Sequence, residues 1–327
     1  MHSPTFLKNK VVLLGALCLL LGGCSTGFLG LAPAGDKKEY VHARTLYNEQ
    51  KYQEAVAELT GYIYKAGNVK RREARAYRLL GRSYEQLGQL NKALEVYLEA
   101  LEFHPKNVPL LLAAAQLYQR TGLFEQSQKL YARALAQEPD NLEALSGQAE
   151  NYRAIGFYSK ARTYYDQFFA LNPAAAPQYR ARYASTFLNQ NKFEEAYIHI
   201  TMALTEDAKQ PDYWLLSAQA AFGLGRLDEA QAAIDTALLL APDRLDLQFY
   251  EIMGAYQAGH YQRSLQKAQA FLKKHPQEPL GLLLAALSEQ QLGYYARARK
   301  HLQQAAQTAD PKSFVSRVAT QLLTEWK

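Results

Sequence analysis

Apolar side chains along most of this chain recur at helical spacing, in pairs of short segments joined by a tight turn. The clearest pair lies in residues 79–105, where one segment ends at Gly88 and the other ends before Pro105. Apolar residues recur there at i, i+3 or i+4 and i+7, a pattern typical of amphipathic helices. The two stripes are carried by Leu80, Tyr84, Leu90, Tyr97 and Leu101. Because one hairpin of this size cannot bury both stripes by itself, the pattern predicts that neighbouring hairpins cover them.

The same hairpin recurs along the chain with a nearly constant period. A small residue near the start of each second helix marks the copies, and these residues are Ala55, Ala93, Ser127, Ala161, Ala196, Ala230, Ser264 and Ala298. After the first pair the interval is 34 residues, except for one interval of 35 that an inserted residue near Ala176 explains. Turn residues keep the same register, and these are Gly88, Gly122, Gly156, Asn191, Gly225, Gly259 and Gly293. A period of 34 with helix–turn–helix content is the signature of one repeat architecture.

Residues 36–312 therefore resemble the tetratricopeptide repeat (TPR) family. The resemblance implies an all-α fold, a right-handed α-solenoid of about eight TPR helical hairpins. The expected units are 36–69, 74–107, 108–141, 142–175, 177–210, 211–244, 245–278 and 279–312. Residues 313–327 resume a helical spacing through Phe314, Val318, Leu322 and Trp326, and we expect a C-terminal capping helix of the kind that solenoids need for solubility. An amphipathic helix that binds a partner is the alternative interpretation of this segment.

The first 23 residues have the pattern of a signal peptide. Lys8 and Lys10 precede an apolar run over residues 11–21, and two glycines follow it. A basic segment, a short apolar run and small residues at a cleavage site are typical of secretion signals. The run is too short to span a bilayer comfortably as a permanent helix. Residues 21–24, Leu-Gly-Gly-Cys, also resemble the lipobox of bacterial lipoproteins, which implies that Cys24 is acylated and becomes the first residue.

Lipidation of Cys24 would fix the location of the whole chain. Several acyl chains anchor a protein stably at a membrane where one chain does not, and residues 24–35, rich in Gly, Pro and Ala, would form a short tether. In the Gram-negative lipoproteins that this segment resembles, a residue other than Asp after the cysteine permits transfer to the outer membrane, and Ser25 follows here. We therefore expect a lipid-anchored protein of the bacterial outer membrane that faces the periplasm. The alternative is an ordinary signal peptide with an incidental free Cys24.

Charge and motifs exclude several classes of function. The 37 Lys and Arg residues are scattered among 31 Asp and Glu residues, and the net charge of +6 is modest for 327 residues. This balance argues against a nucleic-acid partner, whose phosphates require a basic surface. The chain contains no HExxH, GxSxG or Walker sequence, and its seven histidines show no local metal-ligand spacing. Since the repeats occupy almost every segment, we expect no enzymatic activity, no metal and no cofactor.

The resemblance also locates the surface where a partner would bind. In the family, the first helix of each unit lines the inner surface of the superhelix, and the residues at positions two, five, nine and twelve of the unit face inward. Mapped onto this chain, these positions give a basic and aromatic end with Tyr40, Arg44, Tyr47, Arg75, Arg78 and Arg82. They also give an apolar end with Leu215, Phe222, Phe249, Met253, Tyr256, Leu283 and Leu287. Large apolar residues on an exposed face indicate an interaction site, and the alternative is that adjacent repeats cover them.

Two hypotheses of function follow from these surfaces. Some family members hold the carboxyl terminus of a chaperone with Lys and Asn, but Tyr40 and Arg44 occupy the matching positions here, so that activity is not carried over. We expect a membrane-anchored scaffold whose groove takes a helix or an extended peptide of an envelope protein, in pilus, secretion, outer-membrane or cell-wall assembly. The alternative is a glycan-binding factor in polysaccharide export, in which Tyr40 and Tyr47 stack on sugars and the arginines pair with anionic groups.

Overall fold

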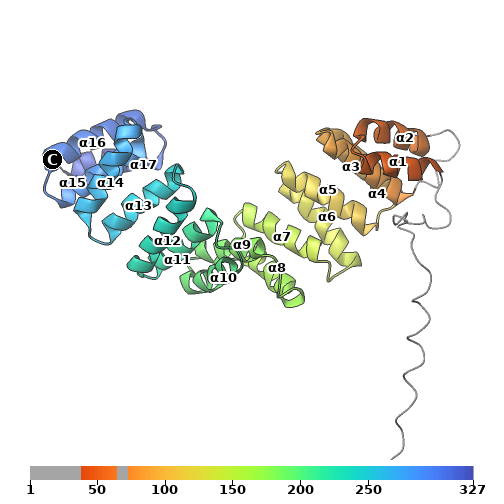
Figure 1. The fold of residues 1–327 in the computed structure, drawn as a ribbon, viewed down its shortest axis with the longest axis horizontal. Coiled ribbons are helices and arrows are strands. Elements are labelled where there is room, and N and C mark those ends of the chain that lie inside the picture. Colours follow the sequence, from red (N-terminus) through yellow and green to blue (C-terminus); the bar gives the residue numbers. More distant parts are fainter. Residues whose placement is uncertain (1–37, 65–72, 327) are drawn as a thin grey trace, which may run out of the picture.

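The computed structural model describes residues 38–64 and 73–326, and this part of the chain contains 17 α-helices and no strand. The helices form an open, bowed array in which the first hairpins and the last helices lie at opposite ends (Figure 1). The first eight helices are α1 (Lys38–Asn48), α2 (Tyr52–Tyr64), α3 (Ala74–Gln86), α4 (Leu90–Phe103), α5 (Val108–Arg120), α6 (Phe124–Gln137), α7 (Leu142–Ala154) and α8 (Tyr158–Leu171).

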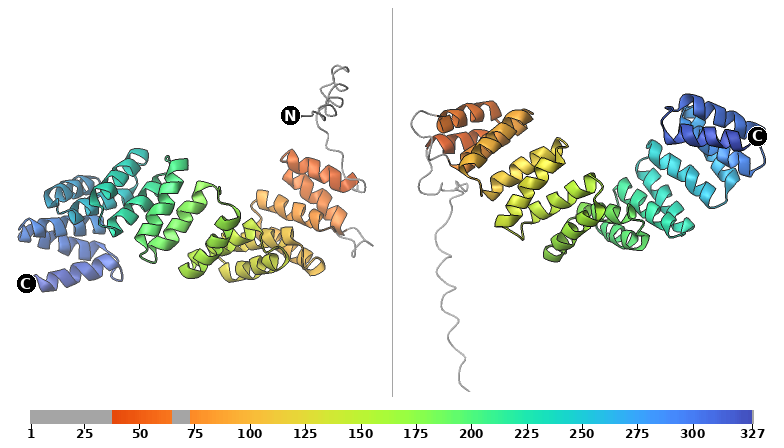
Figure 2. Two further views of the ribbon diagram at one scale, coloured as in Figure 1. Left: turned by 90° about the horizontal axis from the view of Figure 1, so that it is seen from below. Right: turned by 180° about the vertical axis from the view of Figure 1, so that it is seen from behind.

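The second half continues the same alternation without a break in pattern. Its helices are α9 (Pro177–Leu188), α10 (Phe193–Glu206), α11 (Pro211–Gly223), α12 (Leu227–Leu240), α13 (Leu245–Gln257), α14 (Tyr261–Lys274), α15 (Pro279–Gln291), α16 (Tyr295–Thr308) and α17 (Phe314–Glu325). Two further views show the same elongated array from below and from behind (Figure 2). The expected all-α solenoid of eight helical hairpins with a terminal helix is therefore confirmed for the described residues.

Local sequence signals explain where the helices begin and turn. Asn107 and Asn141 cap α5 and α7, since their side-chain oxygens accept hydrogen bonds from the backbone N–H groups of Leu110 and Ala144 at 3.1 and 3.0 Å. Between the paired helices, six turn glycines have φ angles between +71° and +80°, a region that favours glycine. Asn191 takes this conformation in the fifth hairpin, as expected, and Gln50 takes it in the first, where no glycine marks the turn.

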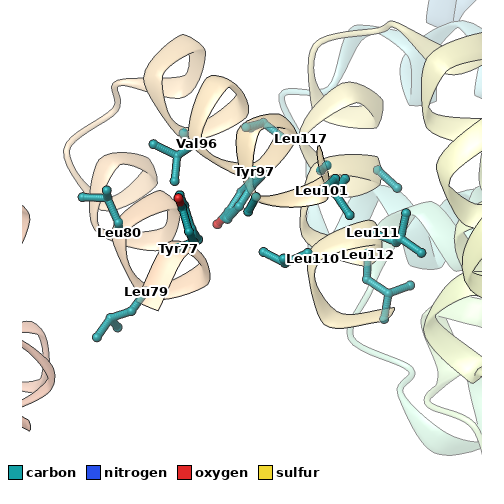
Figure 3. Packing of buried hydrophobic residues seen from close by; sticks show 14 of the residues in the cluster. Tyr77, Leu79, Leu80, Val96, Tyr97, Leu101, Leu110, Leu111, Leu112 and Leu117 are labelled. Carbon is teal, nitrogen blue, oxygen red and sulfur yellow. The ribbon is translucent and has the colours of Figure 1, made fainter. Parts of the chain in front are cut away.

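Small residues allow the two helices of a hairpin to cross closely. Gly81 of α3 lies against the Tyr97 ring of α4, so closely that a β-carbon at Gly81 would lie 2.2 Å from Tyr97 Cε1. Leu80, Val96 and Tyr97 are buried beside this crossing and belong to a cluster that runs from α1 to α7 (Figure 3). The core is thus a chain of contacts between successive helices, as expected for a solenoid in which each repeat contacts its neighbours.

The last helix covers the end of the array, although not with every predicted residue. Ala319 is fully buried in a cluster with Leu282 and Leu302, and Val318 and Leu322 pack against that cluster. Phe314 departs from the expectation, because it is 65% exposed. It is the first residue of α17, directly after the capping residue Ser313, so it precedes the turns that pack against α15 and α16.

Several sequence predictions fall on residues that the structure does not describe. The signal peptide over residues 1–23, the acylated Cys24 and the tether over residues 24–35 all lie outside the described residues and stay predictions. None of the described helices is long and apolar enough to cross a bilayer.

Candidate partner-binding groove

A hollow of about 520 Å³ lies on the face that the first helices of the second, third and fourth hairpins share. Arg78, Arg82 and Glu85 of α3 form one wall. The rest of the hollow is lined by Pro109, Leu112 and Gln116 of α5, at positions two, five and nine of their unit, and by Glu143 of α7, at position two of the next unit. Two of the six residues predicted for the basic end, Arg78 and Arg82, therefore line a real concavity. A volume of this size suits a few side chains of a bound segment.

The arginines of the α3 wall lie one helical turn apart, on one face of the helix. Arg78 is half-buried and Arg82 is exposed. The Arg82 guanidinium lies over the ring of Tyr47 in α1, with 5.6 Å from Cζ to the ring centroid. This cation–π contact orients the guanidinium without neutralising its charge. Tyr47 also packs edge-on against Tyr52 at 5.4 Å between centroids.

Glu85 adds a carboxylate to the same wall, but this carboxylate already accepts hydrogen bonds from two neighbouring side chains. The Tyr97 hydroxyl donates to Glu85 Oε1 at 2.7 Å, and Arg120 Nη1 donates to Oε2 at 2.6 Å. Burial and the adjacent Glu85 charge both raise the pKa of Tyr97, which keeps its hydroxyl a donor. Glu85 is thus paired within the protein and contributes little net negative charge to the hollow.

Glu143 forms the far rim of the hollow, and only its position in the repeat could have indicated this role from the sequence. Gln116 Nε2 donates to Glu143 Oε1 at 2.6 Å. Burial raises the pKa of the Glu143 carboxyl, while the Gln116 hydrogen bond and the Arg78 charge act in the opposite direction. The hollow therefore has a basic wall on α3 and an acidic rim on α7.

The remaining residues of the predicted basic end have different surroundings. Tyr40 is only 7% exposed and packs against Tyr62, and the Arg75 guanidinium lies 4.8 Å from the Tyr40 ring centroid. Arg75 also forms an ion pair with Glu73 at 2.5 Å. Arg44 is half-buried on α1, at the same position of its unit as Arg82. Tyr40 and Arg75 thus contribute mainly to packing between the first two hairpins.

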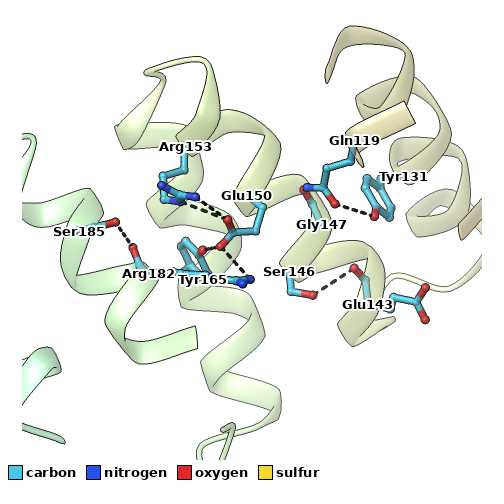
Figure 4. Close-up of polar contacts among 10 residues, drawn as sticks. All are labelled: Gln119, Tyr131, Glu143, Ser146, Gly147, Glu150, Arg153, Tyr165, Arg182 and Ser185. Carbon is cyan, nitrogen blue, oxygen red and sulfur yellow. Dashed lines mark hydrogen bonds and ion pairs between the residues drawn. The ribbon is translucent and has the colours of Figure 1, made fainter. Parts of the chain in front are cut away.

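In the middle of the array, the charged side chains pair with one another. Glu150 of α7 accepts two hydrogen bonds from Arg153, at 2.9 and 3.2 Å, and one from the Tyr165 hydroxyl (Figure 4). Arg182 Nη1 lies 3.7 Å from Glu150 Oε1. Gln119 likewise contacts the Gly147 carbonyl and the Tyr131 hydroxyl. These groups satisfy one another, so this stretch offers a partner few uncompensated charges.

At the predicted apolar end, neighbouring hairpins cover much of the surface. Leu283 is 3% exposed, and the other six predicted residues are half-buried. Phe249 packs against Phe271 at 5.0 Å between centroids, and Tyr256 packs against Tyr261 at 5.3 Å. A hollow of about 260 Å³ lies nearby between α12, α13 and α14, but none of the seven residues lines it. The geometry favours the alternative in which adjacent repeats account for these residues.

The described residues hold no group of three or more His, Cys, Asp or Glu side chains placed to bind a metal ion. We therefore find no candidate metal centre in residues 38–64 and 73–326, and the hollow on α3, α5 and α7 is the site with the clearest geometry.

Comparison with known proteins places the repeats in a family. A model described as tetratricopeptide repeat matches residues 40–108, 146–211 and 251–314, and two further models of the same description match residues 84–150 and 211–244. Among curated proteins, none matches the chain.

Solved structures show the same fold at low sequence identity. The APC/C hetero-tetramer Cut9–Hcn1 aligns over 88% of this chain, with 14% identity and a TM-score of 0.55, and the chain spans only 55% of that protein. YrrB, a TPR protein with an unusual peptide-binding site, aligns over 58% of this chain and 97% of its own, with 14% identity and a TM-score of 0.52. PilW, a type IV pilus biogenesis factor, aligns over 63% and 96%, with 17% identity and a TM-score of 0.55.

Proposed function

Because this chain belongs to the tetratricopeptide repeat family, we propose that it is a non-enzymatic scaffold that binds partner proteins in its groove. The observation that carries the proposal is the hollow of about 520 Å³ between α3, α5 and α7, lined by charged and amide side chains at groove positions. Peptide binding by the similar YrrB fold supports this mode of binding. Backbone and side-chain contacts along such a groove suit an extended peptide or a helix.

We further propose that the scaffold is anchored by lipid on Cys24 and assists the assembly of a cell-envelope machine. The Leu-Gly-Gly-Cys sequence at residues 21–24 supports the anchor, and the fold of the pilus biogenesis factor PilW supports the class of machine. Labelling with radioactive palmitate tests the anchor. Wild type should incorporate label and fractionate with the outer membrane, whereas Cys24→Ser should do neither, and equal labelling would refute the anchor.

Site-specific photo-crosslinking tests the groove as the binding surface. A crosslinker at Gln116, in the hollow, should capture a partner protein in intact cells. The matched position is Leu239 of α12, which is 84% exposed and lies outside the hollow. The partner identified from Gln116 should bind the purified chain and should not crosslink from Leu239. Capture at Leu239 alone would place the interaction elsewhere.

The glycan-binding alternative has less support from the geometry. Stacking on sugars requires open tyrosine faces, but Tyr40 is 7% exposed and the Tyr47 ring is occupied by Arg82 and Tyr52. The arginines could still pair with anionic sugars. An anionic polysaccharide is therefore the competing ligand for this surface.

A further inference from the structure

We infer that the α3 wall of the hollow recognises an acidic segment of the partner protein, an extended stretch with Asp or Glu side chains. This inference rests on the proposed function and specifies the chemistry of the partner. It is carried by a difference between three arginines, Arg44, Arg78 and Arg82, and the other arginines on or beside the groove.

Other arginines on or beside the groove have carboxylate partners, both at this end and farther along the array. Arg120 pairs with Glu85, Arg153 and Arg182 pair with Glu150, and Arg244 pairs with Asp212 and Asp246 at 2.5 and 2.6 Å. Such pairs neutralise both charges locally.

Arg44, Arg78 and Arg82 differ from these residues. Throughout residues 38–64 and 73–326, no carboxylate lies within 4.0 Å of their guanidinium nitrogens, although all three occupy groove positions. The contact that Arg82 makes with the Tyr47 ring leaves its charge available. Arg78 is half-buried in the hollow and so is partly removed from water, and its charge attracts an anion more strongly than on an open surface. Arg78 and Arg82 therefore make the α3 wall of the hollow positive, and Arg44 adds a third cation at a groove position of α1.

The geometry of the α3 wall favours carboxylate side chains on a peptide. A guanidinium donates two parallel hydrogen bonds to one carboxylate, and Arg78 and Arg82 lie one turn apart on the same wall. Glu143 closes the other side of the hollow at α7. Since like charges repel, a bound segment should place its acidic residues beside α3 and a neutral or basic residue beside Glu143. A polymer with uniform negative charge would meet repulsion at that rim.

Selection from a display library of randomised twelve-residue peptides, with the full chain as bait, tests the inference. Peptides that bind wild type should be enriched in Asp and Glu, and their affinity should fall steeply with added salt. The double variant Arg78→Gln/Arg82→Gln should bind these peptides about tenfold to a hundredfold more weakly. The matched control Arg263→Gln/Arg317→Gln removes the same charge from exposed positions outside the hollow and should bind like wild type. Circular dichroism verifies that both variants are folded.

The other outcomes would overturn either the acidic segment or the scaffold function itself. Enrichment of peptides without acidic residues, or unchanged affinity in the hollow variant, would refute the acidic segment and leave the scaffold function intact. If wild type selects no peptide, the groove takes no protein segment, and the proposed function fails together with this inference. Alginate, a polysaccharide with uniform negative charge, serves as the competitor. If alginate binds through Arg78 and Arg82 while no peptide is selected, the glycan function replaces the one proposed.

Discussion

At the residue scale, the groove and the core depend on a few side chains that meet across hairpins. Tyr97 is the clearest example, because its ring fills the space beside Gly81 while its hydroxyl positions Glu85 at the hollow. One buried residue thus links packing between two helices to the electrostatics of the site. A change at such a position should alter both stability and binding.

Replacement of Gly81 by alanine should destabilise the protein. The added β-carbon would lie 2.2 Å from Tyr97 Cε1, so the ring or the helix must move, at a cost of about 1–3 kcal/mol. Gly61→Ala is the matched control, since this helical glycine has no atom within 4 Å of an added β-carbon. It should stabilise the protein by about 0.5–1 kcal/mol. Urea unfolding followed by circular dichroism measures the free energy of unfolding of both variants. A stabilising effect of Gly81→Ala would contradict the close packing of Gly81 against Tyr97.

His199 should make the stability of the α9–α10 hairpin depend on pH. Its ring lies 4.5 Å from the Tyr183 ring and 5.4 Å from the Phe187 ring between centroids, and its buried Nδ1 has no hydrogen-bond partner among the described residues. Burial lowers the pKa of His199, as does the nearby Arg180 charge, whereas Asp166 and Glu195 act in the opposite direction.

The sign of this effect follows from proton linkage. The folded pKa of His199 is below the ordinary value of 6.5, so the unfolded chain binds more protons, and the free energy of unfolding falls as pH drops below 6.5. Between pH 7 and pH 5, the free energy of unfolding measured by urea titration should fall less in His199→Gln than in wild type. An identical pH slope in wild type and His199→Gln would exclude this source.

At the scale of the element, each helix buries one stripe against its neighbours, and the terminal helix does this on one side only. The stripe of α17 contains Val318, Ala319 and Leu322, and it covers Leu282 and Leu302 of the last hairpin. Its opposite side meets water. The helix therefore acts as the cap that a solenoid requires, and its removal would expose an apolar surface.

Ala319→Asp should detach α17 from the last hairpin. A carboxylate at this fully buried position has no partner, so we expect a loss of about 3 kcal/mol or more from the stability of this end. Thr320→Asp introduces the same charge at the adjacent, exposed position and should have little effect. Size-exclusion chromatography and binding of a hydrophobic dye should report self-association and apolar exposure for Ala319→Asp alone. Identical behaviour of the two variants would show that α17 is not a cap.

At the scale of the whole molecule, the array has no single central core. Buried clusters follow the chain, with one from α1 to α7 and others distributed from α7 to α17. The described ends lie far apart in every view (Figures 1 and 2). Stability in such an array is approximately a sum of repeats and their nearest-neighbour contacts, so damage at one end should remain local.

Leu80→Ala tests this locality. The cavity left by the side chain should cost about 2–5 kcal/mol, and amide hydrogen exchange should accelerate in α1–α6 while α13–α17 exchange as in wild type. Leu302→Ala, at an equally buried leucine of α16, should give the reciprocal result. Uniform acceleration over the whole chain by either variant would indicate one cooperative unit instead.

The sequence by itself determined the repeat, because its period, turn glycines and small crossing residues are local requirements of a helical hairpin that must stack. The repeated spacing therefore predicted the helices and their order. Combined with the resemblance to the repeat family, the same register also predicted that Arg78 and Arg82 lie at groove positions of their unit.

Only the tertiary structure decided which groove residues a partner can reach. The burial of Tyr40 and Leu283 depends on neighbouring hairpins. The rim formed by Glu143 depends on the packing of α7 relative to α5. The positive charge of Arg78 and Arg82 also depends on contacts between residues far apart in sequence. For example, Glu85 of the same wall is paired with Arg120 of α5. A repeat pattern fixes where a side chain points, whereas its exposure and charge balance are set by neighbours that only the folded array brings together.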